Sequence, residues 1–148
     1  PMTIHVVLFR GQGLISALIR WQTRGEFSHA ALLIDGDLYE AWQGVGVRIK
    51  RAWQQPTDGS VVLFDVMATS SESAAIYRYC QRQLGKGYDY RGVLRFITRN
   101  RSGDQRRLFC SELVFDAFKA AELDLFNECQ GWEVPPDRLK WSPLLKRR

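Results

Sequence analysis

The sequence predicts an α+β fold, a small antiparallel β-sheet or barrel packed against helices, because two patterns follow each other along the chain. The first half holds short runs of β-branched and aromatic residues that end at Gly or Asp-Gly. The second half holds apolar residues at helical spacing with polar and basic residues between them. Strands that precede the helices, rather than alternate with them, are typical of α+β proteins.

In the first half the apolar runs predict strands, and Asp35-Gly36-Asp37 is a strong hairpin signal between two of them. Apolar residues mixed with Ser and Ala predict a short helix over Leu14–Trp21. The expected strands are Ile4–Phe9, His29–Ile34, Leu38–Trp42, Val45–Ile49 and Ser60–Val66.

In the second half two segments carry clear helical patterns. Ser70–Leu84 opens with Ser and Glu, which are typical of a helix start, and is stopped by Gly85 and Gly87. Cys110–Glu122 has an apolar stripe of 3.6-residue period and predicts an amphipathic helix. The remaining expectations are a short helix at Arg91–Thr98, a loop at Arg101–Arg106 and irregular structure over residues 123–148.

The 148 residues suit a single domain, 1–148, and the 45% hydrophobic and 25% charged residues are ordinary for a soluble globular protein. Three Cys far apart in the sequence do not indicate a disulfide scaffold, so a reducing compartment is expected. No apolar window approaches the ~20 residues of a transmembrane helix. Without a recognisable signal peptide, we expect a cytoplasmic location by default, or delivery by a phage or a secretion machine.

The net charge of +5 is concentrated in one stretch, residues 78–107. A positive surface there would attract a nucleic acid, an anionic lipid or an anionic cell-wall polymer, although no specific nucleic-acid-binding motif is visible. The structural alternative is a solvated basic surface. Arg78, Arg82 and Lys86 are spaced by four, as if on one helical face. The full basic set is Arg78, Arg82, Lys86, Arg91, Arg95, Arg99, Arg101, Arg106 and Arg107.

Cys110 is the strongest candidate for a nucleophile, because a helix N-terminus and upstream arginines favour thiolate over thiol. His29 is the polar residue in an apolar strand and is a candidate base. Glu40, on the next strand, could orient the imidazole. Strict pairing across the hairpin places about residue 32 opposite Glu40, so contact with His29 depends on strand stagger. Each of these residues also has a structural alternative: packing for Cys110, a hydrogen bond for His29, and a surface ion pair for Glu40.

The other cysteines and histidine lack such a setting. Cys80 lies within a helix pattern and indicates packing, Cys129 lies in a loop, and His5 has no evident partner in its strand. No Cys or His pair has metal-ligand spacing, so neither a metal nor another cofactor is expected.

Four motifs in order resemble the circularly permuted NlpC-type papain-like cysteine hydrolases, the YiiX/YaeF-like group, in which the His strand precedes the Cys helix. The pattern is a Ser-His ahead of an apolar strand, a Glu-Ala on the next strand, a Gly-x-x-Tyr-Asp stretch, and a Cys-Ser-Glu that opens a helix. The segment around Val134–Leu139 also resembles the family's closing segment. The four motifs are Phe27–Ile34, Leu38–Ala41, Gly85–Asp89 and Phe109–Val114.

The resemblance implies a Cys-His-Glu triad. Cys110 matches the nucleophile, His29 the general base and later acid, and Glu40 the orienting residue. The Cys110 backbone N–H would contribute to an oxyanion hole. Residues that match the motifs and are candidates for substrate binding are Tyr88, Ser28 and Ser111.

Three functions follow as hypotheses. The first is a cysteine amidohydrolase or peptidase that cleaves a small amide or cell-wall peptide bond through an acyl-enzyme. The second keeps the thiol and acts on phospholipid acyl groups, for which residues 78–107 and the tryptophans would face a membrane surface. The third is a non-enzymatic module that binds a polyanion. Dependence on Cys110 separates the first two from the third, and a requirement for vesicles separates lipid from peptide substrates.

Overall fold

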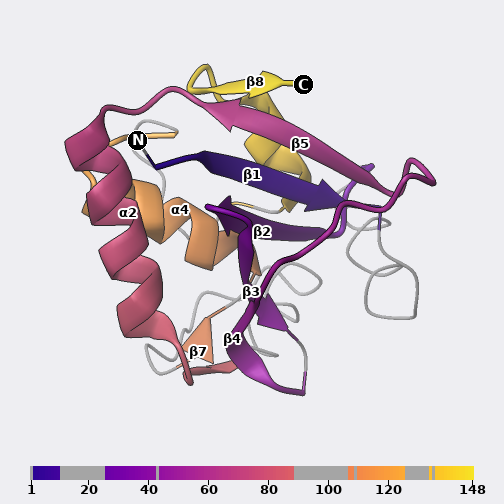
Figure 1. Cartoon of the computed structure of the whole chain (residues 1–148), viewed down its shortest axis with the longest axis horizontal. Coiled ribbons are helices and arrows are strands. Elements are labelled where there is room, and N and C mark those ends of the chain that lie inside the picture. Colours follow the sequence, from indigo (N-terminus) through magenta and orange to yellow (C-terminus); the bar gives the residue numbers. More distant parts are fainter. Residues whose placement is uncertain are drawn as a thin grey trace.

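The fold is built around a six-stranded antiparallel sheet of order β4-β3-β2-β1-β5-β8, and the α+β prediction is confirmed (Figure 1). The computed structural model describes residues 2–10, 26–42, 44–88, 107–108, 110–125, 134 and 136–148. The sheet strands are β1 (Ile4–Phe9), β2 (His29–Ile34), β3 (Asp37–Trp42), β4 (Gly46–Lys50), β5 (Val61–Val66) and β8 (Leu145–Arg147). The other elements are α2 (Ser70–Gln83), β6 (Gly87–Tyr88), β7 (Arg107–Leu108), α4 (Cys110–Ala120) and the 3₁₀-helix η2 (Pro136–Trp141).

The predicted hairpin between β2 and β3 turns at Asp35 and Gly36, which adopt φ values of 48° and 85°. Two consecutive left-handed residues give a tight two-residue turn that matches the twist of paired strands. The register that follows pairs Ile34 with Asp37 and Leu32 with Tyr39. The first strand lies between β2 and β5, so the centre of the sheet is its most buried part.

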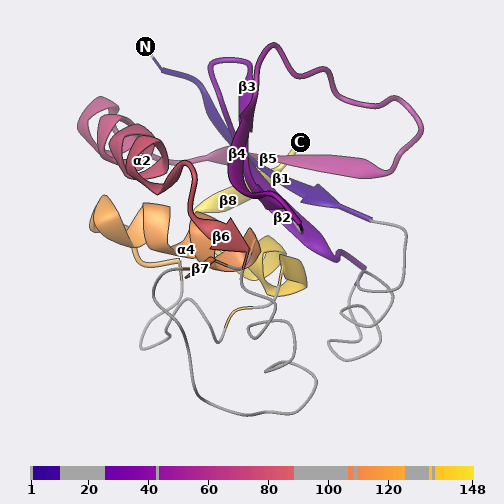
Figure 2. The same ribbon diagram turned by 90° about the horizontal axis from the view of Figure 1, so that it is seen from below.

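The two faces of the sheet carry separate apolar clusters, as the alternation of side chains along a strand requires. On one face Val6, Leu8 and Leu32 belong to the main core with the apolar stripes of α2 and α4. Figure 2 shows both helices on the same side of the sheet. On the other face Val7 and Ala31 belong to a smaller cluster, against which Trp53 packs.

Both long helices have ends that the local sequence explains. Thr69 caps α2 in a capping box with Glu72, in which each side chain binds the backbone N–H of the other residue. The other helix, α4, ends at Ala120 rather than Glu122, because Glu122 adopts a left-handed φ of 59°. The Leu123 N–H then donates to the Phe118 carbonyl, as in a Schellman termination.

The structure corrects three expectations. Residues 123–148 are not wholly irregular, since η2 covers part of the core and β8 pairs with β5. Lys86 lies beyond the end of α2, so Arg78, Arg82 and Lys86 do not form one helical face. His5 does have a neighbour: its Nδ1 lies 3.1 Å from Oδ1 of Asp65 on β5.

The predictions for Leu14–Trp21, Arg91–Thr98 and Arg101–Arg106 lie outside the described residues. Among the helices that are described, none combines the length and the apolarity needed to cross a membrane.

Candidate active site

The structure brings His29 and Glu40 into direct contact. Nε2 of His29, the first residue of β2, lies 2.8 Å from Oε2 of Glu40 on β3. The ladder between these strands ends at the pair Leu32 and Tyr39, so both polar side chains lie just past it. Continuing that register would place Ala31, not residue 32, opposite Glu40. The contact is therefore made by side chains that reach diagonally across neighbouring strands.

Glu40 is held from its other side by a cation on the next strand. Arg48 lies opposite Glu40 in the β3–β4 register, and its Nε and Nη2 donate to Oε1 at 3.0 and 2.9 Å. Lys50 Nζ lies 3.4 Å from the same oxygen. Burial acts to raise the pKa of Glu40, but the bonds to His29 and Arg48 outweigh it and lower the pKa to about 2. The carboxylate is thus ionised and fixed at both oxygens.

The His29 imidazole is also fixed by aromatic rings. The ring of Phe9 lies 5.1 Å away between centroids, and the ring of Trp42 stands nearly perpendicular at 5.2 Å. The Arg48 guanidinium stacks over the same indole at 4.9 Å. Arg48 therefore supports both groups that orient the imidazole, the Glu40 carboxylate and the Trp42 ring.

Cys110 completes the cluster from the helical layer. It is the first residue of α4 and is 1% exposed. Burial alone would lower the pKa of His29, but hydrogen bonds with Cys110 and Glu40 raise it to about 9. Since Nε2 faces Glu40, the other ring nitrogen, Nδ1, is left for the thiol. The imidazole is thus hydrogen-bonded both to a carboxylate and to a thiol, a set of groups that nucleophilic catalysis by cysteine uses.

The remaining predicted site residues are described only in part. Ser28 is buried, and its backbone N–H donates to the Phe9 carbonyl at 3.0 Å. The Tyr88 backbone forms β6, which pairs in parallel with β7, and the Ser111 backbone belongs to α4. The side chains of Tyr88 and Ser111 lie outside the described part of the structure.

Cys80 contrasts with Cys110. It is fully buried in the middle of α2, and desolvation raises the pKa of its thiol to about 12. It therefore has the setting of a packing residue, as its sequence position predicted. Cys129 lies outside the described residues.

Asp137 is a residue that the sequence reasoning did not identify. From η2 its Oδ1 accepts the backbone N–H groups of Glu26 and Phe27 at 2.6 and 3.0 Å. Lys140 Nζ is 3.1 Å from Oδ2. These bonds fix the backbone that enters β2 two residues before His29. The available signal was the family-like closing segment, which contains Asp137 but does not say what it binds.

The described residues contain no group of three or more His, Cys, Asp or Glu side chains that could hold a metal ion. In this part of the chain the His29 imidazole is instead hydrogen-bonded to the Glu40 carboxylate and to the Cys110 thiol. The fold and this cluster together define an α+β protein with a buried Cys-His-Glu constellation at a sheet–helix junction.

No family model matches the chain. A sequence relative is the probable lipoprotein peptidase YaeF of Escherichia coli strain K12. It is 29% identical over an alignment of 160 positions, which covers 84% of this chain. The chain spans only 58% of the length of that relative.

A solved structure, the metalloprotein yiiX of Escherichia coli O157:H7, has the same fold with a TM-score of 0.74. The match covers 100% of this chain and 96% of that chain at 17% identity. The sequence relative and the shared fold both agree with the resemblance to the YiiX/YaeF-like group.

Proposed function

We propose that this protein is a cysteine hydrolase that cleaves an amide bond with Cys110 as nucleophile, His29 as acid and base, and Glu40 as the orienting residue. The observation that carries the proposal is the 2.8 Å contact from His29 to Glu40, with the Cys110 thiol on the other side of the imidazole. The name of the relative, a probable lipoprotein peptidase, supports a peptide as the substrate class.

The proposed reaction has two halves, formation of a thioester on Cys110 and its hydrolysis, and Cys110, His29 and Glu40 take part in both. The Cys110 thiolate attacks the carbonyl carbon, and the developing oxyanion is stabilised by backbone N–H groups at the start of α4. The C–N bond then breaks while the His29 imidazolium gives its proton to the leaving amine. Water attacks the thioester as His29 accepts a proton, which releases the acid and restores the thiolate. Glu40 holds the ring and stabilises its charged form.

The order of these groups along the chain also supports the proposal of a permuted papain-like enzyme. His29 and Glu40 lie on β2 and β3, ahead of the cysteine on α4. The spatial set of thiol, imidazole and carboxylate is what the chemistry requires, and it can arise from any chain order.

The first test is alkylation by iodoacetamide across pH, measured separately for each cysteine by mass spectrometry. Cys110 and Cys80 are both buried, so a difference in rate cannot come from burial alone. We expect Cys110 to react at about pH 6, where an ordinary thiol is mostly protonated, and Cys80 to stay unmodified. His29→Ala should lower the rate of Cys110 alkylation at about pH 6 at least about tenfold.

The matched control is His5→Ala, which removes an imidazole from the neighbouring strand β1 without touching the cluster. It should leave the Cys110 rate unchanged. A Cys110 rate indifferent to His29→Ala, or no greater than that of Cys80, would refute the proposed nucleophile. If Cys110 reacts as expected, the next measurement is the release of amines from a peptide mixture, with and without phospholipid vesicles. A requirement for vesicles would indicate a lipid-bound substrate rather than a free peptide.

A further inference from the structure

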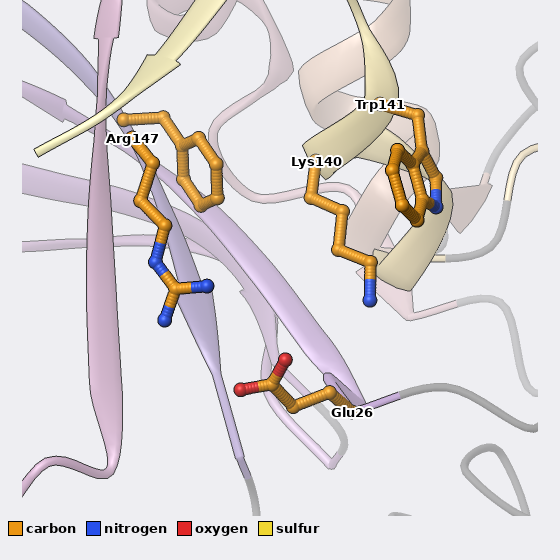
Figure 3. Close-up of a pocket in the computed structure, with 5 residues that line it drawn as sticks. Glu26, Lys140, Trp141 and Arg147 are labelled. Atoms are coloured by element: carbon orange, nitrogen blue, oxygen red, sulfur yellow. The ribbon is translucent and has the colours of Figure 1, made fainter.

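A pocket that none of the Cys-His-Glu residues lines lies where four separate parts of the chain meet (Figure 3). It is a pocket of about 270 Å³ between η2, β5, β8 and the segment that leads into β2. Phe64 forms an apolar floor and is 2% exposed, whereas the Trp141 indole stands open to solvent at 72%. The lining residues are Glu26, Phe64, Lys140, Trp141 and Arg147.

The register of β8 places Arg147 in this pocket. Arg147 pairs with Phe64 across the β5–β8 ladder, so both side chains lie on the same face of the sheet. Lys146 pairs with Asp65, and successive strand residues point to opposite faces. Arg147 is therefore at the pocket, whereas the neighbouring cation Lys146 faces the other side of the sheet.

The charges at the pocket do not cancel. Glu26 forms an ion pair with Arg10, and Lys140 forms one with Asp137. Within the part of the chain that the structure describes, the Arg147 guanidinium has no ion-pair partner. The pocket and its ion-pair partners thus carry a net charge of +1 beside the rings of Phe64 and Trp141. The charges counted are those of Arg10, Lys140 and Arg147 against those of Glu26 and Asp137.

We propose that this pocket binds a small monocarboxylate whose apolar group is about the size of one amino-acid side chain. The carboxylate lies between Arg147 and Lys140, where a planar guanidinium can donate two parallel hydrogen bonds. The apolar group packs on Trp141 and Phe64, which removes the exposed indole from water. The volume is below that of a drug-sized ligand site, and the net charge of +1 matches one carboxylate rather than a dianion.

The opposite reading of the pocket, as a cation site, has less support. Its one carboxylate, Glu26, is already neutralised by Arg10, and a ligand cation would approach both Lys140 and Arg147. The proposal goes beyond the hydrolase, since none of the five lining residues belongs to the Cys-His-Glu cluster.

The test is a titration of the full chain with phenylacetate, followed by the indole N–H resonance of Trp141 in ¹⁵N NMR and assigned through Trp141→Phe. We expect a saturable shift with a dissociation constant on the order of millimolar, as ligands of this size allow. Phenylacetamide, which has the same shape without the charge, should bind at least about tenfold more weakly.

Arg147→Gln should weaken phenylacetate at least about tenfold, whereas Lys146→Gln removes the same charge one residue away and should change the affinity little. Cys110→Ala should bind as the unsubstituted protein does, which separates this proposal from the hydrolase. No saturable shift, equal shifts with the amide, or equal effects of the two Gln variants would overturn it. Tighter binding of phenyl phosphate than of phenylacetate would overturn the assignment to a monocarboxylate.

Discussion

At the scale of single residues, the two oxygens of the Glu40 carboxylate bind different partners, an imidazole and two cations. Oε2 contacts the imidazole, and Oε1 is bound by Arg48 and approached by Lys50. A buried carboxylate with one free oxygen could rotate or take up a proton, whereas this one does neither while Arg48 holds it. The ion pair that was the structural alternative for Glu40 is present, and the same side chain also contacts the His29 imidazole.

The raised pKa of His29 predicts a pH dependence of stability. A group with an ordinary pKa of 6.5 and a folded-state pKa of about 9 binds its proton more tightly in the folded state. The resulting stabilisation is complete below pH 6.5 and is lost as the pH rises through about 9. We expect the free energy of unfolding to fall over this range by on the order of 3 kcal/mol more than in His29→Gln.

Urea unfolding at a series of pH values measures this difference. Cys110→Ala should shrink the fall, because the hydrogen bond with Cys110 is one cause of the raised pKa. Parallel curves for the unsubstituted protein and His29→Gln would show that the imidazole is not held as described.

The three principal site residues could be predicted from the sequence because each interrupts a clear pattern. His29 begins an otherwise apolar strand, Glu40 lies in the strand after a strong turn, and Cys110 opens an amphipathic helix. Their contact could not be derived from strand pairing alone, since the ladder stops before either residue. Arg48 was missed because its partner is set by the register of β3 with β4, which depends on the turn that ends at Gly46.

At the scale of elements, the approach of β6 to β4 depends on one glycine. Gly46 adopts a φ of 93°, and a Cβ at this position would collide with the Lys86 carbonyl oxygen. The Val47 N–H donates to the same oxygen at 2.7 Å, and the Gly85 N–H donates to the Val47 carbonyl. These two hydrogen bonds and the close approach of Gly46 to Lys86 form a seam between the two segments. The seam attaches the segment that carries Tyr88 to the strand that carries Arg48.

Gly46→Ala should therefore cost about 3 kcal/mol of unfolding free energy, from backbone strain and the lost seam together. Gly36→Ala is the matched control, because Gly36 has a φ of 85° with nothing within 4 Å of an added Cβ. It should cost only about 1 kcal/mol from strain. Equal costs in chemical denaturation would mean that the contact with Lys86 contributes nothing.

Most elements of the first half could be predicted, because β-branched runs and Asp-Gly turns are local signals. The elements after residue 123 could not. Leu145–Arg147 is a three-residue edge strand defined by its pairing with β5, and η2 is one short 3₁₀ segment. Such elements have little local preference and take their structure from the surface on which they pack.

At the scale of the whole molecule, hydrogen bonds to Asp137 link η2 to the distant segment that leads into β2. Asp137→Ala would leave the N–H groups of Glu26 and Phe27 without their acceptor and should cost about 3 kcal/mol. Asp137→Asn keeps an acceptor oxygen and should cost less. Because the bonded backbone leads into His29, we also expect slower alkylation of Cys110 in Asp137→Ala than in Asp137→Asn.

Asp58→Ala is the control for removing an aspartate that binds backbone. The Asp58 side chain accepts the Ser60 N–H at 2.9 Å within an exposed turn. Because this side chain is fully solvated, its loss should change the melting temperature little and leave the alkylation rate of Cys110 unaffected. If Asp58→Ala and Asp137→Ala lower the melting temperature equally, the bonds of Asp137 to the backbone before β2 stabilise the fold no more than those of an exposed turn.

The bond from Phe27 to Asp137 spans 110 residues, and this has a consequence for the order of events during synthesis. A ribosome adds about 5–20 residues each second, so the strand that carries the imidazole waits roughly 5–20 s for its clamp. The nucleophile emerges within that interval, before the backbone entering β2 is fastened. In a nascent chain Cys110 would therefore be present before the backbone next to His29 is fixed, and the proposed hydrolase would become active only when η2 docks.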